Sequence, residues 1–317
     1  MAGFSTATTE NLTRTSVWSK QLKDTLLDEL YATRWVDWIT DFPDGTTLNL
    51  PSIGLLEVRD YAEGQPIQYT AMDTGNWQFT VNKYKSVATF IYDKFKHDSY
   101  YTNELISRFV PNMHRAFAKA MEVDFLATFP DSQTLTSLNA INGAAHRFVG
   151  SGTNETIGVK DFERARYALS MANVPLVNLV AIVHPSVEYA LASLTNIVNV
   201  SNNPMWQGIV RDGMSTGTRF KFNIFGWDVY ISQNLKTNAA SETIDSITAA
   251  AGVNNVFFSA AADVLPVKGL IRQSPRIEFE RNKDLQRDEY VATCYYDFKE
   301  FREENIVVIV TDTDQVS

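Results

Sequence analysis

The chain has 317 residues, of which 44% are hydrophobic and 21% charged, a composition that buries a core and excludes a wholly disordered chain. Its net charge of −9 argues against a protein that grips nucleic acid through phosphates, and its single cysteine excludes a disulfide-stapled scaffold or cysteine-rich zinc site. Aromatic residues make up 12% of the chain, a share that often serves interfaces as well as cores.

The N-terminal region begins with a polar, threonine-rich dozen residues, which we expect to form a flexible arm. It shows neither a secretory leader nor, anywhere in the chain, an apolar run of about 18 residues, so we expect a protein made in the cytoplasm. From Thr15, apolar residues recur at three- and four-residue spacing up to Trp35 and Trp38, which predicts an amphipathic helix. Turn residues at Phe42–Gly45 end it.

Residues 46–93 alternate apolar and polar side chains, as in Trp77, Phe79 and Val81. This period of two predicts a long two-stranded ribbon with little core beside it. Such a ribbon is marginal alone and needs a partner surface. Residues 99–129 then return to helical spacing, which predicts a helix about 45 Å long with a kink or restart at Pro111.

The residue pattern changes after a polar loop over residues 131–158. A helix over 159–172, an apolar strand over 176–183 and a helix from Pro185 to about Leu194 predict an α/β unit. Further strands are expected in 222–231 and 256–258. Residues 276–281 and 289–298 predict a hairpin, and 304–311 a last strand. The alternating charges of 278–289 fit either a solvated hairpin or a salt-bridge network between subunits.

Two motifs raise the question of catalysis. Gly213–Gly217 matches the pattern of a hydrolase nucleophile elbow around Ser215, but no strand precedes it and every histidine lies earlier in the chain. His184 follows a buried strand, where enzymes place functional residues, yet His184-Pro185-Ser186 also suits the start of a helix, which we favour. With no nucleotide-binding glycine loop and no metal-ligand spacing, we expect no catalytic residue, cofactor or metal.

The order of elements resembles the major capsid proteins of tailed bacteriophages, the Hong-Kong-97-type fold that encapsulin shells share. ARYALSMANVP (165–175), LVAIVHPSVEYALASL (179–194), FGWDVYISQNL (225–235) and REENIVVIVTD (302–312) carry the local likeness. The resemblance implies an α+β fold with an N-terminal arm, a β-ribbon called the E-loop, a long spine helix, a P-domain and an A-domain.

The resemblance also implies divisions of the chain. They are an N-terminal arm and helix over 1–45, E-loop ribbon and P-domain strands over 46–98, the spine helix and P-domain over 99–157, the A-domain over 158–272, and closing strands with the tail over 273–317. Some relatives cross-link through an E-loop lysine. Residues 48–82 contain no lysine, so we expect no such cross-link unless Lys83 or Lys85 replaces it.

The implied function is a structural protein, not an enzyme, that self-assembles as hexamers and pentamers into an icosahedral virion capsid around double-stranded DNA. We expect a separate scaffolding protein and a portal as partners, DNA packaged without sequence-specific binding, no membrane, and assembly in the host cytoplasm. An encapsulin-type compartment shell and, more remotely, a serine hydrolase are the alternatives. The candidate contacts between subunits are aromatic, because such anchors carry most interface energy: Trp35, Trp38, Tyr61, Tyr69 and Trp77.

Overall fold

The computed structural model describes residues 30–40, 47–53, 60, 63–64, 74–98, 102–152, 155–193, 220–238, 240–249 and 251–312. Three sequence predictions lie outside these residues: the first part of the N-terminal helix, the tip of the ribbon with Tyr61 and Tyr69, and the glycine motif at 213–217.

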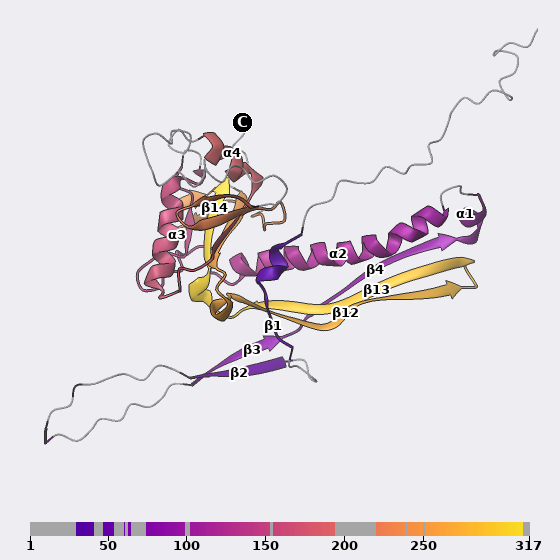
Figure 1. The fold of residues 1–317 in the computed structure, drawn as a ribbon, viewed down its shortest axis with the longest axis horizontal. Coiled ribbons are helices and arrows are strands. Elements are labelled where there is room, and N and C mark those ends of the chain that lie inside the picture. The colour runs from indigo at the N-terminus through magenta and orange to yellow at the C-terminus, as the bar shows by residue number, and fades with distance from the viewer. Residues whose placement is uncertain are drawn as a thin grey trace, which may run out of the picture.

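A long helix, α2, lies along an elongated four-stranded sheet in one half of the subunit (Figure 1). The helix confirms the prediction for 99–129 and continues through Pro111 without a restart. Apolar side chains of its C-terminal half, such as Phe117 and Phe125, are buried against Tyr296 and Phe298 of the sheet. The elements of this half are α2 (Thr102–Asp131), α1 (Asp93–Asp98) and, in sheet order, β1 (Asp37–Trp38), β12 (Val267–Asn282), β13 (Arg287–Glu300) and β4 (Lys83–Tyr92).

The predicted ribbon over 46–93 does not include β4 in the structure. Among its described residues, β2 (Thr47–Ile53) and β3 (Thr74–Thr80) pair with each other and extend away from the two larger sheets (Figure 1). β4 instead pairs with β13 over ten residues, from Lys83 opposite Tyr296 to Tyr92 opposite Arg287. The alternation in β4 reports one covered face and one exposed face. It does not report which strand lies beside it, and this is why the prediction extended the ribbon too far.

A six-stranded mixed sheet forms the second half, with helices α3 (Val159–Met171) and α4 (Pro185–Ser193) packed on it. Both helices and the central buried strand β6 (Leu179–Val183) confirm the predicted α/β unit. The strands, in sheet order, are β5 (Arg147–Val149), β14 (Val307–Asp312), β11 (Gly252–Ser259), β6 (Leu179–Val183), β8 (Trp227–Ile231) and β7 (Phe220–Ile224). Short elements complete it: the hairpin β9 (Glu242–Ile244) and β10 (Ile247–Ala249), and the 3₁₀ turns Ala262–Val264 and Glu303–Asn305.

The central strand β6 is buried on both faces, which explains its uninterrupted apolar sequence. Ala181 and Val183 face the cluster that contains α3 and α4. Val180 and Ile182 face the cluster that contains α2 and the elongated sheet. The strand β6 therefore contributes side chains to the hydrophobic cores of both halves.

Two predicted segments differ in the structure. The polar loop over 131–158 contains β5, which pairs in parallel with β14 and whose three residues are all buried. The strand expected over 222–231 is a hairpin, β7–β8, whose turn residues Phe225 and Gly226 both have positive φ. The hairpin β12–β13 is confirmed with longer strands than predicted. The last strand is confirmed as β14, which starts later than predicted, at Val307, and ends at Asp312.

The helix predicted up to the turn at Phe42 is wrong over its described part. Residues Ala32–Trp35 form one 3₁₀ turn, η1, and Asp37–Trp38 form β1 in parallel with β12. Gly269 permits this approach, because a Cβ there would lie 2.5 Å from Val36 and 2.9 Å from the Trp38 ring. Apolar spacing signalled burial correctly, but strand pairing with β12 overrides helix formation here.

The end of the N-terminal arm is attached to α2 through one buried carboxylate, that of Glu122. Its Oε2 accepts hydrogen bonds from the backbone amides of Tyr31 (2.7 Å) and Ala32 (3.1 Å). Its Oε1 accepts from Asn234 Nδ2 (3.1 Å) in the segment that follows β8. Three segments far apart in sequence therefore meet at one side chain.

Replacing Glu122 tests this junction. Glu122→Ala leaves buried amide donors without an acceptor, so we expect a loss of about 3 kcal/mol in the free energy of unfolding. Glu122→Gln keeps one acceptor and should lose about 1 kcal/mol. Urea denaturation of unassembled subunits measures both. The control is Glu163→Ala on the exposed side of α3, expected to change stability by less than about 0.5 kcal/mol. Equal losses for the Glu122 and Glu163 variants would contradict the junction.

Candidate functional site: surfaces for assembly

The described candidate aromatic residues occupy three different environments. Trp35 is 8% exposed and packs against Tyr230 and Phe258, with ring centroids 5.0 and 5.8 Å away, inside its own subunit. Trp38 is 36% exposed and lies beside Phe298. Trp77 is half-buried at the base of the ribbon. The structure therefore does not gather these three residues into one surface, and Trp38 offers the most free area.

The base of the ribbon is packed against the body of the subunit. Phe79 and Val81 are buried with Leu270, and the Trp77 ring lies 5.2 Å from that of Phe301. The indole Nε1 of Trp77 donates a hydrogen bond to the carbonyl oxygen of Glu300 (2.8 Å). Part of the Trp77 side chain is thus committed within its own subunit, and the rest is available to a neighbour.

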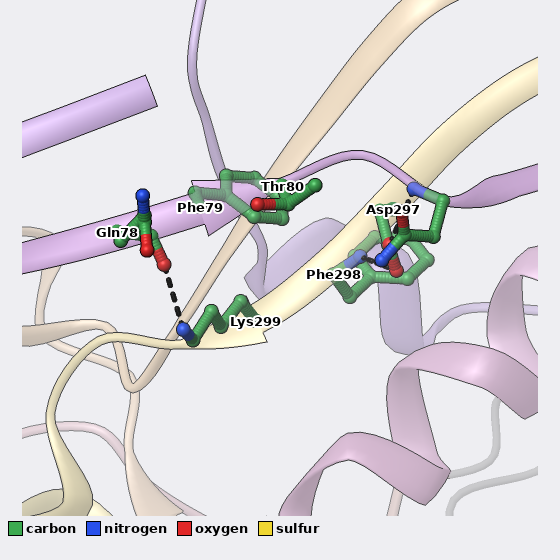
Figure 2. A pocket seen from close by; sticks show the side chains of 7 residues that line it. Gln78, Phe79, Thr80, Asp297, Phe298 and Lys299 are labelled. Atoms are coloured by element: carbon green, nitrogen blue, oxygen red, sulfur yellow. Dashed lines mark hydrogen bonds between the residues drawn. The ribbon is translucent and has the colours of Figure 1, made fainter. Parts of the chain in front are cut away.

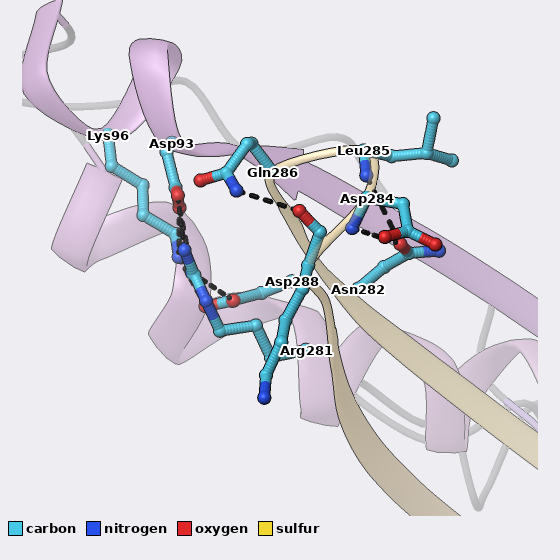
Figure 3. A network of polar contacts seen from close by, with 9 residues as sticks. Asp93, Lys96, Arg281, Asn282, Asp284, Leu285, Gln286 and Asp288 are labelled. Atoms are coloured by element: carbon cyan, nitrogen blue, oxygen red, sulfur yellow. Dashed lines mark hydrogen bonds and ion pairs between the residues drawn. The ribbon is translucent and has the colours of Figure 1, made fainter.

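The far end of the elongated sheet is closed by a network of ion pairs (Figure 3). Arg281 on β12 bonds to Asp93 of α1 (Nη2–Oδ2, 2.5 Å) and to Asp288 of β13 (Nη1–Oδ1, 3.1 Å). Lys96 of α1 also pairs with Asp288. In the adjoining turn, Asn282 Oδ1 accepts from the backbone amide of Asp284 (3.1 Å). The alternating charges of 278–289 therefore bind α1 to the hairpin within one subunit, an arrangement that neither sequence interpretation anticipated.

The network changes the titration of Asp93. The hydrogen bond from the Arg281 guanidinium is the main reason that the pKa of Asp93 falls from its ordinary 3.8 to about 2, with the charges of Arg281 and Lys96 adding to the effect. A depressed carboxylate pKa stabilises the folded state above the ordinary pKa, and that contribution disappears as the pH falls from about 4 to about 2.

A second charged group lies between α2 and β4. Asp124 of α2 accepts hydrogen bonds from Lys85 Nζ (2.5 Å) and the Tyr296 hydroxyl (2.6 Å), and Lys83 Nζ is 3.6 Å away. Burial raises the pKa of Asp124, but the two hydrogen bonds and the lysine charges outweigh it and leave the pKa below its ordinary value. Lys83 and Lys85 therefore lie on β4 of the elongated sheet and not in the ribbon β2–β3.

An exposed aromatic stripe on β4 was not predicted as a contact surface. Tyr84, Phe90 and Tyr92 are 61%, 49% and 47% exposed. Their even positions put them on the face opposite Lys85, whose side chain contacts α2. Exposed apolar side chains along one face mark an interaction surface. The alternating sequence pattern of these residues could have indicated the stripe, but the pattern was interpreted as part of the ribbon.

The described residues support the non-catalytic interpretation of His184. Its Nδ1 accepts from the backbone amide of Ser186 (3.3 Å) and is 2.9 Å from the Ser186 hydroxyl, as the start of α4 requires. Burial lowers the pKa of His184. Within the described ranges, no cluster of histidine, cysteine and acidic residues is arranged to hold a metal, and no helix is long and apolar enough to cross a membrane.

An elongated sheet with a long helix, a projecting ribbon and a second α/β sheet together define a structural subunit whose extended parts suit contact with other chains. The family described as phage capsid protein matches residues 77–309, more than half of the chain. The chain therefore belongs to the phage capsid protein family, whose members are structural components of the virion capsid and not enzymes.

Solved structures have the same fold over nearly the whole chain. The capsid of the cyanophage P-SCSP1u is similar with a TM-score of 0.71 and 14% identity, over 95% of this chain and 93% of that one. Mycobacterium phage Che8 gives 0.67 and 18%, over 94% and 97%, and the capsid of a native GTA particle gives 0.65 and 12%, over 98% and 100%. No curated protein sequence matches the chain. The predicted mixed α+β capsid fold is confirmed.

The Asp93–Arg281 pair gives an acid-titration prediction. We expect the carboxyl carbon resonance of Asp93 to titrate near pH 2, and Arg281→Gln to move that midpoint up towards the ordinary 3.8. The matched control is Arg276→Gln on the same strand, whose guanidinium pairs with Glu278 and not with Asp93. An Asp93 midpoint that is the same in wild type and in Arg281→Gln would contradict the pair.

Proposed function

We propose that the chain is a major capsid protein that assembles as hexamers and pentamers into an icosahedral shell around double-stranded DNA. The family match over residues 77–309 carries this proposal. The ribbon β2–β3 supports it, because an isolated two-stranded ribbon is marginally stable in water and gains from a neighbouring surface. The same family match favours a phage capsid over an encapsulin-type compartment and over a serine hydrolase.

The partners follow from the shell. We propose a separate scaffolding protein and a portal, with assembly in the host cytoplasm before the DNA enters. The net charge of −9 supports DNA packaging without sequence-specific binding, because a negative container repels phosphates over the Debye length of about 8 Å at physiological salt. Tight binding of duplex DNA by purified subunits at that salt concentration would contradict this.

The proposed contacts between subunits keep the five aromatic candidates and add the stripe on β4. Trp38, Trp77 and the β4 residues Tyr84 and Phe90 have free surface in the subunit. Trp35 has the least, because its ring is buried in the core. Tyr61 and Tyr69 belong to the ribbon segment outside the described residues. Each contact can be weak, because many identical copies in a shell add their contributions by multivalency.

Shortening the ribbon tests whether it joins subunits. Replacing residues 60–72 with a short Gly-Ser turn removes the tip and keeps β2 and β3 paired. We expect soluble subunits with unchanged urea unfolding that form no particles in size-exclusion chromatography and negative-stain imaging. Normal particles from this variant would remove the ribbon from the assembly contacts.

Substitution of Trp77 distinguishes its packing within the subunit from its proposed contact with a neighbouring subunit. Trp77→Ala should cost about 1–2 kcal/mol in subunit unfolding, less than in a closed core because the side chain is half-buried. It should lower the melting temperature of particles by more than that of subunits. Trp77→Phe is the matched control, which keeps an aromatic ring and loses only the bond to Glu300. Equal falls in the two melting temperatures would make Trp77 a core residue alone.

A further inference from the structure

The ribbon joins the body of the subunit through a very short connection. β3 ends at Thr80 and β4 begins at Lys83, so only Val81 and Asn82 separate a strand of the ribbon from a strand of the elongated sheet. A two-residue connection between strands that belong to different sheets is a natural hinge. Whatever holds these two residues determines the direction in which the ribbon leaves the subunit.

The last six residues of β13 hold this connection and the adjoining end of β3 (Figure 2). Asp297 Oδ2 accepts from the backbone amide of Asn82 (3.0 Å), and the Tyr295 hydroxyl donates to the carbonyl oxygen of Val81 (2.8 Å). Lys299 Nζ donates to the carbonyl oxygen of Gln78 (2.6 Å). The fourth bond is that from Trp77 to the Glu300 carbonyl.

A cleft lies along this contact, lined by Gln78, Phe79, Thr80, Asn82, Asp297, Phe298 and Lys299 (Figure 2). Phe79 and Val81 are also buried against Leu270, so apolar packing contributes to the same contact. Apolar packing is not directional, whereas hydrogen bonds fix the orientation of the groups that they join. The hydrogen bonds from β13 therefore constrain the direction of the ribbon more tightly than the packing does.

Asp297 differs from the other members of the contact in burial and charge. The residue is 7% exposed, and its Oδ1 accepts from the amide of Phe298 (2.8 Å) while Oδ2 accepts from the amide of Asn82. Lys83 Nζ lies 3.8 Å from Asp297 Oδ1 and 3.6 Å from Asp124 Oδ1. A buried carboxylate makes stronger hydrogen bonds than neutral acceptors do. Lys83 also links it to the helix α2.

We propose that Asp297 is the positioning residue that fixes the direction of the ribbon, and that Lys83 couples this direction to α2 through Asp124. This inference rests on the proposed function for its biological meaning, since the ribbon is there assigned to contacts between subunits. The geometry of the ribbon within one subunit can nevertheless be measured without any assembly.

The experiment measures the distance between the ribbon and the sheet by electron spin resonance in the full-length subunit. Spin labels are placed at Ser52→Cys on β2 and Ser86→Cys on β4, both exposed and both nearly isosteric changes. The native Cys294 is buried and does not compete for the label. Hydrogen exchange at the Asn82 amide is followed in the same variants.

Three substitutions and one control are compared. Asp297→Ala removes the acceptor and the charge, and should at least double the width of the distance distribution and accelerate Asn82 exchange roughly tenfold. Asp297→Asn keeps an acceptor oxygen and loses the charge, and Lys83→Met breaks the link to α2, so both should give smaller changes. The control is Thr293→Val on β13, the strand of Asp297. It removes the hydrogen bond that Gln273 of β12 donates to the Thr293 hydroxyl and should leave both measurements unchanged.

The outcomes separate the inference from the proposed function. A wild-type distance distribution and wild-type Asn82 exchange in Asp297→Ala overturn the positioning role, whether or not particles form. If that variant fails to fold, the same result in Asp297→Asn and Lys83→Met together overturns it. A broadened distribution supports the role. If particles of normal size then still assemble, the role of Asp297 stands and the ribbon's part in assembly is contradicted.

Discussion

The buried carboxylate of Glu122 is the interaction on which the arrangement of the subunit depends. It lies on α2, the helix shared by both halves, and accepts hydrogen bonds from the end of the N-terminal arm and from the segment after β8. A charge buried in this way is tolerated only because several donors satisfy it. Two residues further along α2, Asp124 points to the opposite side and binds Lys85 and Tyr296. Through Asp124 the helix contacts the elongated sheet, and through Glu122 it contacts the arm and the segment after β8.

Within the described residues, one group of charged side chains forms a network inside the subunit, whereas several aromatic side chains remain exposed to solvent. Arg281, Asp93, Lys96 and Asp288 close the tip of the elongated sheet among themselves. Tyr84 and Phe90 on β4 face outward without comparable cover. This division suits a protein that meets many copies of itself, since rigid charge networks present a fixed shape while apolar side chains supply contact energy.

The sequence predicted the elements whose signal is local. The helical spacing over residues 99–129 identified α2. The apolar run over 176–183 identified a strand buried on both faces, which the structure places at Leu179–Val183. Predictions were wrong where a distant segment decides the local structure. Val36 to Trp38 are extended because β12 offers an edge beside Gly269, and β4 pairs with β13, more than 190 residues away. The family and the shell function were predictable from element order. The hydrogen bonds of Asp297 and Glu122 were not, because their partners lie far away in the sequence and no local pattern links them.

Strand β6 has a consequence for how the subunit opens. Its alternate residues Val180 and Ala181 belong to two different clusters, so neither cluster can be exposed to water without disturbing the strand that the other also uses. We therefore expect the two halves to open together, as one cooperative unit, in native-state hydrogen exchange. This coupling comes from a single five-residue strand, and it ties the exposure of either cluster to the opening of the other.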